Sequence, residues 1–186
     1  VGNGAFNPTA PLSRAAFCKM AMEAQGRGAE AAAQANRVVF PDVTAKHWAL
    51  GYVNAASRPA AEGQPALVSG KGDGRFHPDD NITYAEAVTI LMRMLGYSDT
   101  DVGVGAMWYD GYLGMAAQVE LTKGLTRSGG ATVSRGEAAR LFQNLLFTDL
   151  KDSESPYLTK LGGQIAESQI VLSTDAKADD GTKDSV

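Results

Sequence analysis

Two arginines are expected at the first position of predicted helices, where their positive charge favours a nearby anion. Arg14 and Arg135 each follow a serine, Ser13 and Ser134, and each precedes apolar residues with helical spacing. A cation at a helix N-terminus faces the positive end of the helix dipole, so an anion is expected nearby. Unpaired backbone N–H groups at a helix start also attract anions, and a guanidinium offers a planar fork for a carboxylate. The alternative is a salt bridge from each arginine to an acidic residue of a neighbouring segment.

The helices that would position these arginines belong to a repeated pattern. The segments 12–16, 82–86 and 133–137 have similar sequences, and each leads into apolar residues at positions i, i+3, i+4 and i+7. This spacing predicts one buried face on each of three helices. The three sets are Phe17, Met20, Ala21 and Ala24; Ala87, Ile90, Leu91 and Met94; and Ala138, Leu141, Phe142 and Leu145. Such repetition indicates copies of one unit that share a core.

The flanking residues repeat as well. Residues 2–8 align without gaps on residues 72–78, and Trp48 recurs as Trp108 at an offset of 60. The full unit is therefore a helix, a loop and a second helix. The first unit lacks its front helix because the chain begins inside its loop. The predicted divisions are a partial unit at 1–39, complete units at 40–100 and 101–150, and a tail at 151–186 that leads toward a further domain.

Five motifs together resemble one bacterial repeat family. They are Phe40-Pro41-Asp42-Val43, His47-Trp48-Ala49, Val68-Ser69-Gly70, the segment 72–78 and Ile82-Thr83-Tyr84-Ala85-Glu86, and they look like an S-layer homology repeat. The resemblance covers residues 1–148. It implies an all-α fold of three helix-loop-helix repeats, the first truncated, packed about a pseudo-threefold axis. It also implies an extracellular module that anchors a protein to the bacterial wall by binding an anionic, often pyruvylated, secondary cell-wall polysaccharide.

The resemblance implies a set of glycan-binding residues at matching positions. They are Arg14, Arg135, Ser13, Ser134, Trp48, Trp108, Gly70 and Gly72. The sequence departs from the family pattern at Tyr84, where an arginine is expected, and at Ala16, where a glutamate is expected. We therefore expect up to two competent sites, near Arg14 and Arg135. A pyruvyl carboxylate would be their ligand.

Several of these positions also have a purely structural interpretation. Thr83 with Glu86, and Ser134 with Glu137, match a capping box, in which each cap stabilises the helix by about 1 kcal/mol. A tryptophan at the same place in each unit favours core packing over stacking on a sugar. The glycines at positions 70, 72 and 74 are expected in tight turns with positive φ, and they could also admit a ligand close to the backbone.

Composition excludes several classes of function. The net charge is −4, and residues 1–148 carry thirteen basic and thirteen acidic side chains, which argues against a nucleic-acid partner. No apolar run reaches the length of a membrane span. Cys18 is the single cysteine, so no intrachain disulfide forms. Two histidines, His47 and His77, are too few to predict a zinc site, and neither another metal nor a cofactor is expected.

Catalysis is not expected, although one loop contains suitable groups. Asp73, Asp79, Asp80 and His77 could act as acid and base, but they fit ordinary turn chemistry and nothing pairs them across a cleft. The predicted function is therefore wall anchoring. The alternative is a protein-binding or self-assembly module whose grooves hold other copies of a surface-layer protein.

Two expectations concern the ends of the chain. Without a front helix in the first unit, Phe17, Met20 and Ala21 would be exposed. Removal of upstream residues is the favoured explanation; cover by a folded-back segment 157–172 or by another chain is the alternative. In the tail, residues 156–167 predict a short helix and residues 169–172 a short strand.

Overall fold

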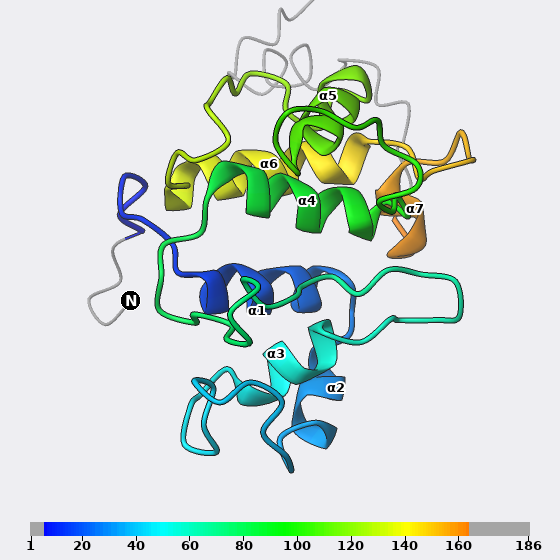
Figure 1. The fold of residues 1–186 in the computed structure, drawn as a ribbon. Helices are drawn as coiled ribbons and strands as arrows, with labels where there is room; N and C mark the ends of the chain where they lie inside the picture. The colour runs from blue at the N-terminus through cyan, green and yellow to red at the C-terminus, as the bar shows by residue number, and fades with distance from the viewer. Residues whose placement is uncertain (1–5, 164–186) are drawn as a thin grey trace, which may run out of the picture.

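The computed structural model describes residues 6–163, and their regular structure is helical (Figure 1). The helices are α1 (Arg14–Ala24), α2 (Gly28–Ala33), α3 (Leu50–Ala56), α4 (Tyr84–Met94), α5 (Asp110–Gln118), α6 (Arg135–Phe147) and α7 (Tyr157–Lys160). Isolated bridges occur between these described segments, but no strand does. The all-α prediction is therefore confirmed.

The three predicted long helices are present, and each begins immediately after its predicted cap. The hydroxyl of Ser13 accepts the N–H of Ala16 at the start of α1. Thr83 caps α4 and Ser134 caps α6, and both of these helices have the complete capping box. The box is missing from α1 because Ala16 has no carboxylate to return to the cap.

A closed ring of backbone hydrogen bonds joins the segments that lead into these helices. The N–H of Leu12 donates to the carbonyl of Val133 at 3.1 Å, and the N–H of Val133 donates to Ile82 at 3.1 Å. The N–H of Ile82 completes the ring by donating to Leu12 at 2.9 Å. All three side chains are buried. The segments that lead into α1, α4 and α6 thus meet at one buried junction, although they lie far apart in the sequence.

The first N–H groups of each long helix are already paired with carbonyls of a loop that is distant in the sequence. At α1, the N–H of Arg14 donates to Asp80 at 2.8 Å and that of Ala15 to Pro78 at 2.9 Å. Equivalent bonds join Tyr84 to Ala131, Ala85 to Gly129, Arg135 to Ala10 and Gly136 to Pro8. The expectation of an anion site made from unpaired helix N–H groups is therefore wrong, because the loops satisfy these donors within the chain.

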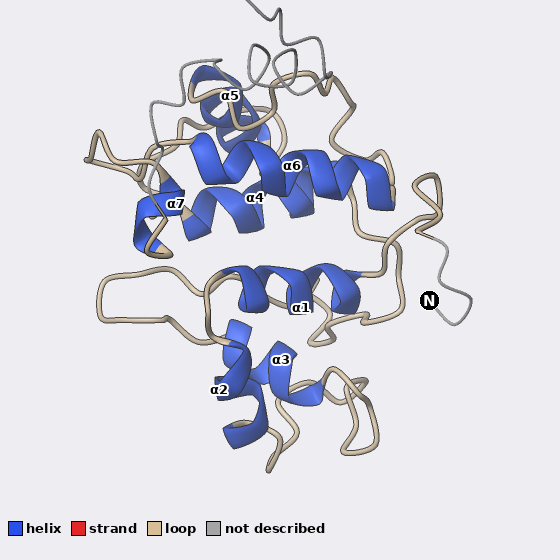
Figure 2. Cartoon of the chain, turned by 180° about the vertical axis from the view of Figure 1, so that it is seen from behind, coloured by secondary structure: helices blue, strands red, loops and turns tan. Residues whose placement is uncertain are grey.

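The short helices cover the outer faces of the long ones. Helix α3 packs on α1, α5 packs on α4, and α7 packs on α6, as Figures 1 and 2 show from opposite sides. Phe17 on α1 is fully buried and its ring lies 5.3 Å from that of Phe142 on α6. Ala21 is also fully buried, and Met20 is half-buried. The expectation of an exposed strip on α1 is wrong, because α6 packs against Phe17 and the buried Tyr157 of α7 donates a hydrogen bond to the carbonyl of Ala24 at 3.4 Å. The start of the segment 157–172 therefore covers part of this face, as the folded-back alternative expected.

A separate helix, α2, follows α1, because Gly26 has a φ of 71° and ends the first helix. The remaining expectations have mixed outcomes. The predicted tail helix is present but short, as α7. The predicted strand at 169–172 lies outside the described residues. Cys18 is buried and unpaired, and this burial raises the pKa of its thiol to about 12. None of the helices in residues 6–163 is long and apolar enough to cross a membrane.

Candidate functional site

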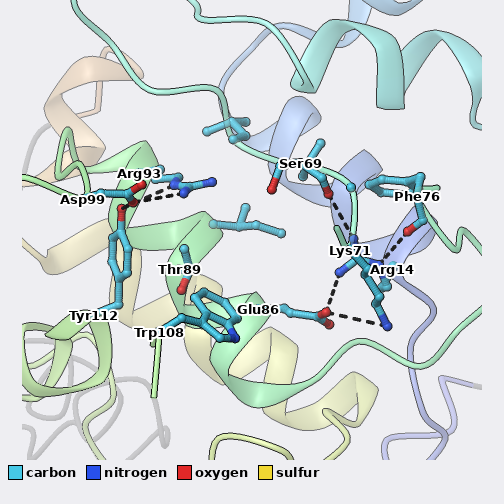
Figure 3. A pocket seen from close by; sticks show the side chains of 14 residues that line it. Arg14, Ser69, Lys71, Phe76, Glu86, Thr89, Arg93, Asp99, Trp108 and Tyr112 are labelled. Carbon is cyan, nitrogen blue, oxygen red and sulfur yellow. Dashed lines mark hydrogen bonds and ion pairs between the residues drawn. The ribbon is translucent and has the colours of Figure 1, made fainter. Parts of the chain in front are cut away.

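A groove of about 520 Å³ lies between α1, α4, the loop 67–71 and the segment that precedes α5 (Figure 3). Its polar and aromatic lining consists of Arg14, Ser69, Lys71, Phe76, Glu86, Thr89, Arg93, Asp99, Trp108 and Tyr112. Three of the predicted site residues, Arg14, Gly70 and Trp108, line this groove together. The groove therefore combines charged ends with an aromatic surface.

Arg14 is buried at one end of the groove and is held by four contacts. Its Nη1 pairs with Glu86 at 2.7 Å, and its Nε and Nη2 donate to the carbonyls of Phe76 and Ser69 at 2.9 and 3.3 Å. The guanidinium also lies 4.8 Å from the centre of the Phe76 ring. The structural salt bridge that was the alternative for Arg14 is therefore present.

Lys71 is a second cation at this end, and the sequence analysis did not single it out. Its Nζ lies 3.1 Å from Asp80 and 3.7 Å from Glu86. The Glu86 carboxylate thus faces both Arg14 and Lys71, while its other oxygen caps α4. Lys71 is the more accessible of the two cations, with 32% of its side chain exposed against 7% for Arg14.

The opposite end of the groove is charged but balanced. Arg93 pairs with Asp99 at 3.2 Å, and the hydroxyl of Tyr112 donates to the same carboxylate oxygen at 2.6 Å. This hydrogen bond, together with the cation of Arg93, lowers the pKa of Asp99 although partial burial opposes the shift. Burial and the bond to Asp99 raise the pKa of Tyr112 to about 12. At neutral pH this end therefore presents one cation, one carboxylate and a neutral phenol.

Both tryptophans are on the surface, so the expectation of core packing is wrong. Trp48 is 56% exposed and Trp108 is 63% exposed. The buried aromatic residue of α5 is Tyr112, one turn later, so Trp108 is left at the rim of the groove. Trp48 holds the matching place before α3 and stacks on His47. The stacking alternative for a sugar is the one that this exposure favours.

The two predicted glycines have different roles. Gly72 adopts a φ of 83°, as expected for a tight turn. Gly70 does not have a positive φ; a Cβ there would lie 2.8 Å from the carbonyl oxygen of Arg75. A side chain at position 70 would therefore push the groove wall apart.

Asp42 holds this loop in place, and the sequence analysis gave it no role. Its carboxylate accepts the N–H groups of Phe76 and His77 at 3.0 and 2.6 Å. Partial burial opposes ionisation, but these hydrogen bonds prevail and lower the pKa of Asp42. The Phe40-Pro41-Asp42-Val43 motif was the available signal.

Arg135 lies outside this groove and has a different environment. Its Nε donates to the carbonyl of Phe6 at 2.7 Å, and its guanidinium lies 5.1 Å from the Phe6 ring centre. Among residues 6–163 it forms no ion pair within 4 Å of a carboxylate. On α1, Ala16 occupies the position that Glu86 occupies on α4. Arg135 is thus the less constrained of the two predicted arginines.

The Tyr84 position belongs to a second, shallower hollow. The Tyr84 hydroxyl donates to the carbonyl of Leu125, and Arg127 and Lys123 also line the hollow. Arg127 forms an ion pair with Glu137, the acidic residue of the α6 capping box.

The hydroxyls of the predicted residues Ser13 and Ser134 are both engaged as helix caps. Within the described residues no group of metal-binding side chains is gathered.

Comparisons with known proteins identify a family and several relatives of this chain. Residues 66–88, which include the loop and the start of α4, match the S-layer homology domain family. The chain is 32% identical over 153 residues to the "Middle cell wall protein" of Brevibacillus brevis, which covers 81% of this chain and 13% of that protein. It is 29% identical over 147 residues to the "Cell surface protein" of Thermoanaerobacter kivui, covering 78% of this chain and 18% of that protein.

A third relative belongs to the same class. The "Surface layer protein" of Brevibacillus choshinensis is 32% identical over 124 residues, covering 67% of this chain and 10% of that protein. The chain spans less than a fifth of the length of each of these relatives. The chain therefore carries an S-layer homology domain of a bacterial cell-surface protein, and it belongs to the extracellular cell wall or surface layer.

Proposed function

We propose that this module anchors a surface protein by binding a carboxylate-bearing wall polysaccharide in the groove beside Arg14. The observation that carries the proposal is the pairing of two cations, Arg14 and Lys71, next to the exposed indole of Trp108. Three cations, Arg14, Lys71 and Arg93, are balanced by Glu86, Asp80 and Asp99, so a ligand carboxylate is held by local contacts to the accessible Lys71 and not by a net positive charge. A pyruvyl ketal on a sugar supplies such a carboxylate, and the sugar ring supplies a face for the indole.

The arrangement of the units supports this proposal. The closed ring of hydrogen bonds through Leu12, Ile82 and Val133 is what three units about an approximate threefold axis would form. In that arrangement, with units at 1–39, 40–100 and 101–150, Arg135 marks a second groove on the α1 side, near Trp48. Tyr84 marks a third groove that lacks the arginine and binds weakly. No catalytic step is part of the proposed function.

The proposal is tested by binding the protein to purified wall polysaccharide with and without its pyruvyl groups, measured by calorimetry. A charge-assisted contact contributes about 1.5–3 kcal/mol, so a Lys71→Gln/Arg135→Gln variant should bind the pyruvylated polymer at least tenfold more weakly. Tyr84→Phe and Lys123→Gln serve as controls and should bind normally. Equal affinity for the two polymers would refute the proposal. Retention on wall fragments stripped of polysaccharide would favour the self-assembly alternative.

A second variant tests whether Glu86 competes with the ligand carboxylate. Glu86→Gln keeps a side chain that can cap α4, since glutamine also serves in capping boxes, but it removes the negative charge that faces Arg14 and Lys71. We expect this variant to bind the pyruvylated polymer about three- to tenfold more tightly, as calorimetry would show. Weaker binding would mean that Glu86 orients Arg14 for the ligand, and competition would be wrong.

A further inference from the structure

The middle of the groove contains a hydroxyl group without a partner. Thr89 lies on α4 between Glu86 and Arg93 and is 4% exposed. Its Oγ1 is buried and has no hydrogen-bond partner among residues 6–163. A helical threonine commonly bonds to a carbonyl one turn earlier, and Thr89 does not. Since an unpaired buried hydroxyl is unfavourable, the chain keeps at this place a polar group that it does not itself satisfy.

The aromatic surface beside Thr89 favours a sugar as the missing hydrogen-bond partner of its hydroxyl. Figure 3 shows the Thr89 hydroxyl on the side of the groove that faces Trp108. Trp108 is 63% exposed and contacts Tyr109 edge to face, with the ring centres 5.4 Å apart. Because the indole of Trp108 is exposed, it can rotate toward the solvent and make room for a sugar ring. A pyranose has an apolar face for such an indole and hydroxyls at its edge for Thr89.

The groove is also longer than the charged end requires. Glu86 and Arg93 are separated by seven residues of one helix, a rise of about 10 Å, which exceeds the length of one pyranose ring. An acidic sugar held at Arg14 and Lys71 therefore leaves the Thr89 region unfilled. The far end, where Arg93 is balanced by Asp99, favours no further charge on the ligand.

We propose that Thr89 and Trp108 form a second subsite, which binds a neutral sugar adjoining the acidic one. This inference rests on the proposed function, since the acidic sugar must first lie at Arg14 and Lys71. The neutral ring stacks on the indole, and one of its hydroxyls forms the hydrogen bond that Thr89 lacks. The groove then recognises two consecutive sugars, and Thr89 determines the preference for the longer ligand.

The test compares two synthetic ligands by calorimetry. One is a pyruvylated hexose glycoside, and the other is the same residue extended by one neutral hexose. Wild-type protein should bind the disaccharide more tightly than the monosaccharide. Thr89→Val, which keeps the shape and removes the hydroxyl, should weaken disaccharide binding about three- to tenfold and leave monosaccharide binding unchanged. Thr89→Ser should retain the preference, and the melting temperature of Thr89→Val should not fall, because no internal hydrogen bond is lost.

Each other outcome has a definite meaning. If wild-type protein binds both ligands and Thr89→Val binds the disaccharide equally well, the second subsite is refuted while the proposed function stands. If Thr89→Val weakens both ligands equally, the hydroxyl does not belong to a neutral subsite, and the inference is again refuted. If wild-type protein binds neither ligand, nor the pyruvylated polymer, the proposed function and this inference fail together.

Discussion

Replacing Arg14 by alanine should lower the free energy of unfolding by about 3–5 kcal/mol, because removing one partner of a buried ion pair leaves the other charge uncompensated. Arg14 is 7% exposed, and its loss leaves Glu86 without its closest cation and two loop carbonyls without donors. Urea denaturation followed by circular dichroism measures the change. A binding assay alone would not separate this effect from loss of the ligand contact, so the stability measurement comes first.

Arg135→Ala is the matched control. Arg135 has the same position at the start of α6, but among the described residues its side chain donates one hydrogen bond, to Phe6, and forms no ion pair. We expect the free energy of unfolding of this variant to fall by less than about 1 kcal/mol. Equal losses for the two variants would contradict the assignment of Arg14 to a structural network.

Phe17→Ala should destabilise the protein about as much as Arg14→Ala. Truncation of a buried phenylalanine is expected to lower the free energy of unfolding by about 3–5 kcal/mol. Phe17 is fully buried where α1 meets α6, and its ring packs against Phe142. The same urea titration, made on Phe147→Ala, provides the control. Phe147 is 59% exposed at the end of α6, so this second truncation should cost less than about 1 kcal/mol. Similar midpoints for both variants would show that α1 and α6 do not share a core.

Local sequence signals were sufficient to predict the helices. The caps Ser13, Thr83 and Ser134 and the apolar spacing after them depend on residues within about two turns, so they identify each helix start directly. The exposure of the tryptophans was not predictable in this way. It depends on how α3 and α5 lie on the long helices, which is decided by contacts between distant segments.

In the candidate site too, residues within local motifs were predicted, whereas those that depend on contacts between distant segments were not. Arg14 and Trp108 were predicted from motifs, whereas Lys71 and Thr89 were not, because neither belongs to a motif with a recognised ligand role. The unpaired helix N–H groups were predicted wrongly because the sequence does not reveal that Asp80 and Pro78 carbonyls from a later unit reach the start of α1.

The two departures from the family pattern are related in the structure. Arg14 on α1 pairs with Glu86 on α4, so the arginine at the start of one long helix is neutralised by the acidic residue at the start of another. By the same relation, Ala16 would be the partner position for Arg135, and Glu137 the partner position for Tyr84. The glutamate left without a family arginine, Glu137, pairs instead with Arg127. A missing glutamate in one unit therefore affects the arginine of another, which a comparison of single repeats does not show.

The ring through Leu12, Ile82 and Val133 has no first or last member. In an open stack of repeats, duplication of a unit lengthens the array and deletion shortens it. Here a fourth unit would have to break a buried hydrogen bond in order to enter, and loss of one unit would leave an N–H and a carbonyl unpaired at the junction. In the proposed arrangement of three units, closure of this ring sets the number of units. Copying the whole ring, and not a single unit, is then the way to add binding sites without breaking the junction.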